Sequence, residues 1–210
     1  MTTDTRNVPE FTSVSLEGHG DMVLIHGSTP SVIIDTDPET LEHLKVEVEN
    51  GRLVLGMKSW LDHFFHSWKK INYTVTYTTL DKVSVSGSGK VQVDELMSDS
   101  FKFHISGSGS LAAHQLTTND LEVHISGSAN IDLAGMTQRE ELHISGSGKV
   151  VARDLVCQTA DVRVSGSGDL TLNVTEKLNV SISGSAGVRY LGSPQISQSI
   201  SGSGSVKQIE

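Results

Sequence analysis

Residues 83–93 read VSVSGSGKVQV, and residues 103–113, twenty positions later, read FHISGSGSLAA. Both stretches contain the tripeptide Ser-Gly-Ser. It occurs seven times in the chain, beginning at Ser86, Ser106, Ser126, Ser145, Ser165, Ser183 and Ser201. The spacings are 20, 20, 19, 20, 18 and 18 residues, and five copies continue with Gly and two with Ala. These motifs hold 12 of the 20 glycines, so glycine marks one recurrent structural position and not a flexible linker.

The residues that flank each motif alternate between apolar and polar. The position directly before it is always β-branched: Val85, Ile105, Ile125, Ile144, Val164, Ile182 and Ile200. Alternation on both sides of the motif is the period of a half-buried strand. A repeat of 18 to 20 residues is also too short for a pair of helices, and the signature of leucine-rich repeats is missing.

One repeat is long enough to form one turn of a parallel β-helix, in which equivalent residues of successive turns stack about 4.8 Å apart. The sequence therefore predicts an all-β protein with about seven regular rungs over residues 81–210. The β-branched residues would point inside, and the Ser-Gly-Ser motifs would form the corners. A further apolar position, Leu96, Leu116, Met136 and Leu155, is expected to close the first four full repeats.

Residues 1–80 predict a less regular β region that is continuous with the repeats. Residues 16–22 read LEGHGDM and look like a degenerate first rung. Residues 46–55 alternate about Asn50-Gly51, which is the strongest short signal for a hairpin. Residues 38–45 are expected to form one or two helical turns, and residues 71–79 another strand with Tyr73, Val75 and Tyr77 on one face.

Composition excludes several classes of partner. The chain has 16 Lys and Arg residues and 25 Asp and Glu residues. The resulting net charge of −9 argues against nucleic acid or an anionic lipid surface as the main binding partner. The single cysteine, Cys157, cannot form an internal disulfide. No stretch is apolar enough to predict a transmembrane segment. No signal peptide is visible in the first twenty residues, so for an exported protein we expect the signal to have been removed and Met1 to be an engineered start.

Three histidines, His104, His124 and His143, occupy the position two residues before consecutive Ser-Gly-Ser motifs. Their apolar neighbours are predicted to face inward, so alternation turns the imidazoles outward into one column. Neutral imidazoles on adjacent rungs can converge on a transition metal ion. The alternative is an ordinary polar ladder, and we expect this ladder and no bound cofactor.

Residues 60–70, WLDHFFHSWKK, hold four of the ten aromatic residues. On a helix Trp60, Phe64 and Trp68 would share one face, with Leu61 and Phe65 beside it. This insertion is predicted either to plug an open end or side of the β-helix or to contact another subunit, a glycan or a membrane interface.

Catalytic signatures are not evident in the sequence. Asp94, Arg153 and Asn173 share a repeat position with His114 and Ala134, which is a mixed column typical of a solvated face. Asp132, Asp154 and Asp169 fall at different offsets, and the repeated serines lack a unique base partner. We therefore predict no catalytic residues.

These features together resemble the putative autotransporter adhesin family with the head GIN domain, a group of bacterial envelope proteins. The residues that carry the resemblance are Arg6 to Phe11, Val14 to Met22, Val46 to Leu55 and the Ser-Gly-Ser-Gly turns. The resemblance implies a right-handed, single-stranded β-helix, adhesion as the role, and a periplasmic, outer-membrane-associated or cell-surface location. It supplies no catalytic residues.

The resulting expectation is a noncatalytic envelope or surface module for binding or scaffolding. Its partner would be a polysaccharide or another host or cell-surface ligand, or further copies of the chain that contact it through the aromatic insertion. Flat repetitive faces suit such extended partners. The alternative is a carbohydrate-active enzyme on a β-helix, which would need clustered carboxylates on one exposed face.

Overall fold

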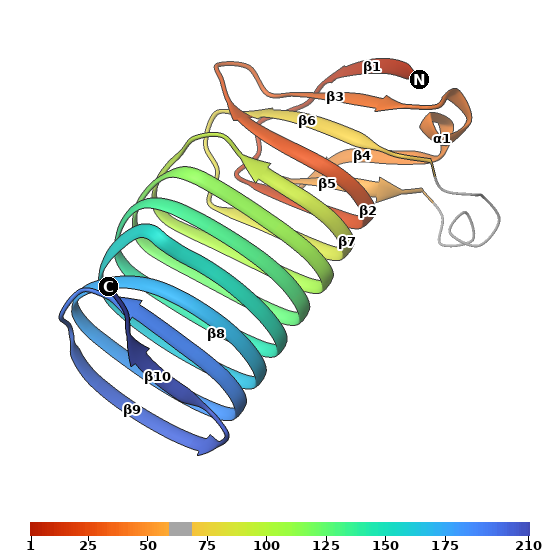
Figure 1. Ribbon diagram of the computed structural model, residues 1–210. Helices are drawn as coiled ribbons and strands as arrows, with labels where there is room; N and C mark the ends of the chain where they lie inside the picture. The colour runs from red at the N-terminus through yellow and green to blue at the C-terminus, as the bar shows by residue number, and fades with distance from the viewer. Residues whose placement is uncertain (59–68) are drawn as a thin grey trace.

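The computed structural model describes residues 1–58 and 69–210, which form β-strands and one short helix (Figure 1). In chain order the elements are β1 (Thr2–Asn7), β2 (Ser13–His26), β3 (Ser31–Thr36), α1 (Pro38–His43), β4 (Leu44–Glu49), β5 (Arg52–Met57), β6 (Asn72–Tyr77), β7 (Lys82–Val93), β8 (Leu96–Leu191), β9 (Gln195–Gly202) and β10 (Ser205–Gln208). The predicted all-β class is confirmed. These strands form a mixed ten-stranded sheet.

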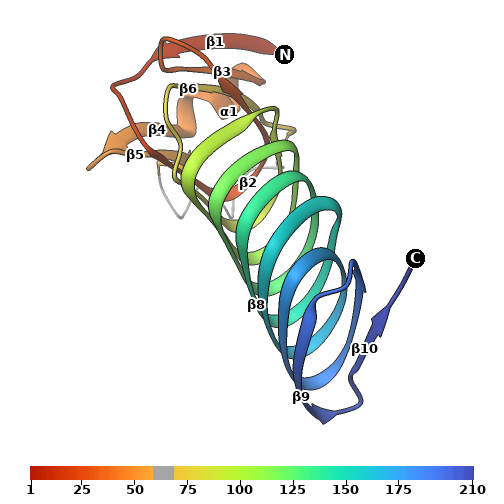
Figure 2. The same ribbon diagram turned by 90° about the vertical axis from the view of Figure 1, so that its left-hand side faces the viewer.

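The repeat region winds through successive turns that stack side by side (Figures 1 and 2). Parallel pairing between β7 and β8 aligns Val85 with Ile105 and Gly87 with Gly107, twenty residues apart. Near the other end, Ser183 of β8 pairs with Ser201 of β9, eighteen residues apart. Residues separated by one repeat thus become direct neighbours, as the repeat spacing predicts.

The predicted apolar column before each motif faces inward. Six of its members are at most 3% exposed: Val85, Ile105, Ile125, Ile144, Val164 and Ile182. The seventh, Ile200, lies on β9 and is 38% exposed. Burial of this continuous apolar ladder is the main stabilising contribution that a repeat can make, since each turn has only its two neighbours to pack against.

The corners depend on glycine. Gly107 and Gly127 have φ angles of 120° and 125°, a region in which only glycine is unstrained. A Cβ atom on Gly127 would lie 2.3 Å from the carbonyl oxygen of Gly107 on the preceding turn. The first glycine of each motif is therefore required twice, by backbone conformation and by the close approach of the next turn.

The N-terminal strands cover one end of the stacked turns (Figure 2). β2 pairs in parallel with β7 over twelve residues and aligns Gly18 with Gly87, so residues 16–22 lie in register with the first Ser-Gly-Ser motif. On its other edge β2 pairs with β5 and then with β6, both in parallel. β3 continues from β6, and β1 from β3, in antiparallel orientation, and this makes the sheet mixed.

Two local predictions in this region are confirmed. β4 and β5 form an antiparallel hairpin about Asn50 and Gly51, whose φ angles of 51° and 74° are those of the tight turn that Asn-Gly favours. α1 is a single short helix that begins after Asp37, whose carboxylate accepts a hydrogen bond from the Thr40 backbone amide at 3.1 Å. The strands β1 and β3 were not predicted from the sequence.

The prediction that Met136 lies in the core is wrong. Met136 is 63% exposed, whereas Leu96, Leu116 and Leu155 at the equivalent positions of other repeats are buried. The third repeat has 19 residues, one fewer than its neighbours, so the inward position passes to Gly135. A Cβ atom on Gly135 would lie 2.0 Å from the carbonyl oxygen of Leu116, which confirms that these two residues are stacked.

Candidate functional site

The three candidate histidines lie in one column on the outer side of the stacked turns. The ring centroids of His104 and His124 are 4.8 Å apart, and those of His124 and His143 are 4.6 Å apart with the planes 9° from parallel. Their side chains are not fully solvated: those of His124 and His143 are 37% and 28% exposed. Turns about 4.8 Å apart bring each ring against the next, which explains this partial burial.

A column of acidic residues runs beside the histidines, formed by Glu122, Glu141 and Asp161. Glu122 Oε1 lies 2.5 Å from His124 Nε2, and Glu141 Oε1 lies 2.8 Å from His143 Nε2. Sequence reasoning missed this column. The signal was the Glu-x-His pattern at 122–124 and 141–143, because residues two apart on a strand share a face.

Cations hold these carboxylates in their ionised form. Lys102 Nζ lies 2.6 Å from Glu122 Oε2, and this hydrogen bond is the main reason why the pKa of Glu122 falls to about 2. Arg163 lies 3.0 Å from Glu141 Oε1, and the pKa of Glu141 is lowered mainly by His143 and also by Arg163. A general acid needs the opposite shift, so neither carboxyl suits that role at neutral pH.

A groove of about 470 Å³ follows the histidine column, and we call it the histidine groove. It crosses several turns and combines imidazole and hydroxyl groups with the edges of apolar residues. Its lining includes His104, His124, His143, Arg163, Ser106, Ser126, Ser145 and Ser165.

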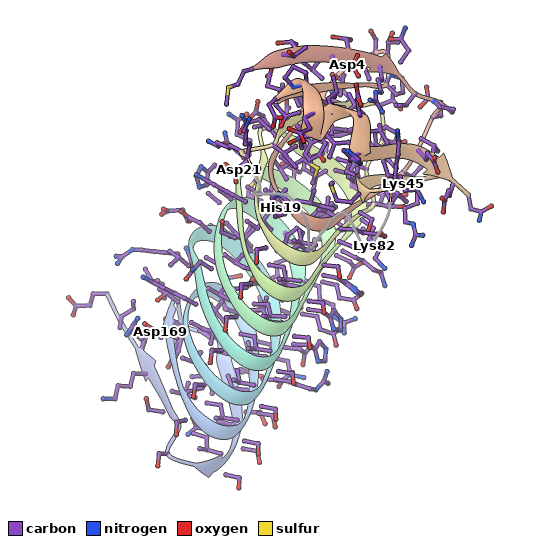
Figure 3. The ribbon with its side chains drawn as sticks, turned by 90° about the vertical axis from the view of Figure 1, so that its right-hand side faces the viewer. Asp4, His19, Asp21, Lys45, Lys82 and Asp169 are labelled. Carbon is purple, nitrogen blue, oxygen red and sulfur yellow. The ribbon has the colours of Figure 1, made fainter. Side chains whose placement is uncertain are left out.

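Around the corner, a second surface carries the other serine of each motif, and we call it the serine face. This serine is exposed in all seven motifs: Ser88, Ser108, Ser128, Ser147, Ser167, Ser185 and Ser203. A shallow groove of about 710 Å³ lies on it, and an adjoining groove of about 530 Å³ shares Ser110, Asn130 and Lys149 with the first. Lys82 pairs with Lys102 of the next turn, and Asp169 lines the larger groove of the serine face. Figure 3 shows that Lys82 and Asp169 lie on opposite sides of the stacked turns.

The charged residues singled out as poor catalytic candidates lie in separate pairs. Asp132 contacts His114 at 3.4 Å, and Asp169 contacts Arg189 at 2.6 Å. Arg153 donates to the carbonyl oxygen of Glu210 at 3.0 Å. These contacts engage each group locally and do not bring the two aspartates to one point.

Trp60, Leu61, Phe64, Phe65 and Trp68 lie outside the described residues, so their role as a plug or a partner contact stays a prediction. Among residues 1–58 and 69–210, no helix has the length and apolar character needed to cross a bilayer.

Several solved structures have the same fold. A putative adhesin from Bacteroides fragilis NCTC 9343 is 27% identical, with a TM-score of 0.93 over 99% of this chain and 96% of that one. A putative lipid binding protein from Parabacteroides distasonis ATCC 8503 is 21% identical, with a TM-score of 0.78 over 100% and 96% of the two chains. A putative adhesin from Parabacteroides merdae ATCC 43184 is 19% identical, with a TM-score of 0.77 over the same shares. The last two likenesses concern the fold alone.

A comparison with curated proteins found no match. The model of one protein family matches residues 10–194, which is most of the chain and includes β2, the hairpin and the first six Ser-Gly-Ser motifs. The sequence resemblance is thereby confirmed, and the chain belongs to the family described as putative auto-transporter adhesin, head GIN domain.

Proposed function

We propose that this chain is a noncatalytic, adhesin-like binding module of the cell envelope or cell surface. Its scaffold would be a right-handed, single-stranded parallel β-helix of about seven rungs over residues 81–210, continuous with an N-terminal β region over residues 1–80. Family membership and the likeness to the Bacteroides fragilis putative adhesin support the adhesin-like role. The same family supports the proposal of a periplasmic, outer-membrane-associated or surface location.

The proposed ligand is an extended polysaccharide that lies along the serine face. The observation that carries this proposal is the exposed serine present in every motif, flanked by Asn130 and Lys149 in two shallow grooves. Serine hydroxyls both donate and accept hydrogen bonds, as sugar hydroxyls do. Each contact is weak alone, but a chain of sugars that follows the ladder engages several turns at once, and its affinity rises with its length.

Oligosaccharides of increasing length provide the test, after a glycan array has chosen the sugar. Affinity should rise with the number of residues, and Ser128→Ala/Ser147→Ala should weaken binding by about tenfold through the loss of two hydrogen bonds. Thr117→Ala/Gln158→Ala removes polar groups from other exposed positions and is the matched control. Equal binding by both double variants, or no glycan bound at all, would contradict the proposal.

A carbohydrate-active enzyme is the alternative. The acidic column is the feature that favours it, although its two glutamates have lowered pKa values and basic partners. Incubation of the same oligosaccharides with the protein separates the two functions, because only an enzyme yields shortened or unsaturated products.

Packing with other copies is a further part of the proposal. β9 is exposed at all eight positions, with Ile196 and Ile200 42% and 38% exposed, and an open strand edge of this kind favours pairing with another chain. Light scattering over a range of concentrations tests it, and a monomer at every concentration would count against it.

A further inference from the structure

We propose that His104, Glu122 and His124 bind one divalent transition metal ion, with zinc the best match to two imidazoles and a carboxylate. One ligand atom from each of the three residues lies within 4.8 Å of the other two. Zinc takes nitrogen and oxygen ligands at about 2.0 to 2.2 Å, so small side-chain rotations suffice to close the set around an ion.

The site is assembled from two turns. Glu122 and His124 are two residues apart on one strand segment and share its outer face, whereas His104 comes from the preceding turn and stacks at 4.8 Å. The stacked backbones therefore hold the ligands in place before an ion arrives. This preorganisation reduces the entropy that is lost on binding.

His104 supplies an independent observation. Its Nε2 atom is buried, and among the described residues it has no hydrogen-bond partner. A buried polar atom without a partner is costly, and a metal bond at this nitrogen would remove the cost.

The carboxylate of Glu122 is oriented toward the proposed metal site. Its Oε2 atom is held by Lys102 Nζ at 2.6 Å, which leaves Oε1 directed at His124 Nε2. Carboxylates that bind metals are commonly held by a hydrogen bond from a second group. In the ion-bound state, the metal would take the place of the proton between Glu122 and His124.

The next turn repeats the residue types but not the site. Glu141 and His143 have the same spacing as Glu122 and His124, yet Arg163 lies 3.0 Å from Glu141 Oε1 and 3.1 Å from His143 Nε2. The guanidinium thus contacts both ligand atoms, at the place where an ion would have to bind them. This contrast makes His143 a matched control within the same column.

Three protein ligands leave at least one coordination position toward the histidine groove, where His104 and His124 are part of the lining. Sites with three protein ligands and an open position hold a water molecule or an oxygen or nitrogen atom of a second molecule. The metal site shares no residue with the serine face, so the glycan proposal and this one succeed or fail separately.

Titration of the full chain without a polyhistidine tag tests the proposal. Zn²⁺ is added in a calorimeter, and Co²⁺ is added as a spectroscopic probe of ligand geometry. We expect one ion per chain, visible Co²⁺ absorption bands and a higher melting temperature with Zn²⁺. His104→Gln and His124→Gln should each weaken binding by about 100-fold, and His143→Gln by less than about threefold.

Two results would overturn the site. The first is no saturable binding of Zn²⁺ or Co²⁺ by the wild-type chain, which needs no variant to fold. The second is binding that survives His104→Gln or falls equally in His143→Gln, which would indicate ions adventitiously bound by exposed histidines. Circular dichroism melting curves of each variant show whether a loss of binding reflects a loss of fold. If His104→Gln fails to fold, His104→Ser replaces it, because Ser84 already occupies the same column on the preceding turn.

Discussion

The carboxyl group of Glu140 lies beside the thiol of Cys157 inside the stacked turns, and both side chains are fully buried. Glu140 occupies an inward position that other repeats fill with Phe101, Leu121 and Leu178. Burial raises the pKa of Glu140 to about 7 from 4.5 and also raises the pKa of Cys157. A carboxyl in this position is neutral in the folded state over most of the acidic range.

Stability should therefore fall between pH 4.5 and pH 7. Below pH 4.5 Glu140 is protonated in both states, and as the pH rises the unfolded state ionises first. The folded state loses about 3 kcal/mol over this range, and the loss levels off above the folded pKa of about 7. Urea denaturation at a series of pH values measures it.

The matched variants isolate this effect. Glu140→Leu should remove this contribution to the pH dependence and raise stability at pH 7.5 by about 2 kcal/mol, since an apolar residue of similar size fills the column. Glu176→Gln, which changes an exposed glutamate, is the matched control. If wild type and Glu140→Leu show the same slope, Glu140 is not the source.

The first and second glycines of the Ser-Gly-Ser-Gly motifs should differ sharply in how much stability is lost when alanine replaces them. Gly127→Ala should cost about 3 kcal/mol or more, because of its φ angle of 125° and the contact with the Gly107 carbonyl oxygen. Gly109→Ala should cost less than about 1 kcal/mol, because the nearest atom lies 3.3 Å away and Ala129 fills the equivalent position. Chemical denaturation measures both, and the reverse order would refute this account of the corner.

A charge inside the stacked turns should abolish folding. Ile125 is 2% exposed, so Ile125→Asp places an unpaired carboxylate among apolar side chains at a cost of several kcal/mol. Ser126→Asp, at the next and exposed position, should fold normally. Circular dichroism and melting curves compare the two variants. A normal melting curve for Ile125→Asp would show that the assignment of the inner and outer faces is wrong.

Tryptophan fluorescence reports on the aromatic insertion alone, because Trp60 and Trp68 are the two tryptophans of the chain. If the insertion packs as a plug within the protomer, emission should be blue-shifted and iodide should not quench it. Strong quenching in the monomer would reject the plug. Protection from iodide that appears only at concentrations where light scattering detects oligomers would support the subunit contact.

Much of the architecture could be predicted from the repeat itself. The constant β-branched residue before each motif identified the inward ladder, and the Asn50-Gly51 pair identified the hairpin, because both patterns act within a few residues of chain. The strands β1 and β3 escaped prediction, since their pairing is with distant segments and their sequences lack a repeat.

The sequence by itself determined a pitch of 18 to 20 residues, the inner and outer faces of each turn, and the positions where only glycine can turn the chain. These properties are local, because alternation and backbone sterics operate between adjacent residues. Only the tertiary structure decided that Lys102 holds Glu122 beside His104 and His124, that Arg163 occupies the next site, and that Glu140 is buried. Such contacts join residues about one repeat apart, so they depend on the register of stacked turns, and a single missing residue in the third repeat is enough to change which side chain faces the core.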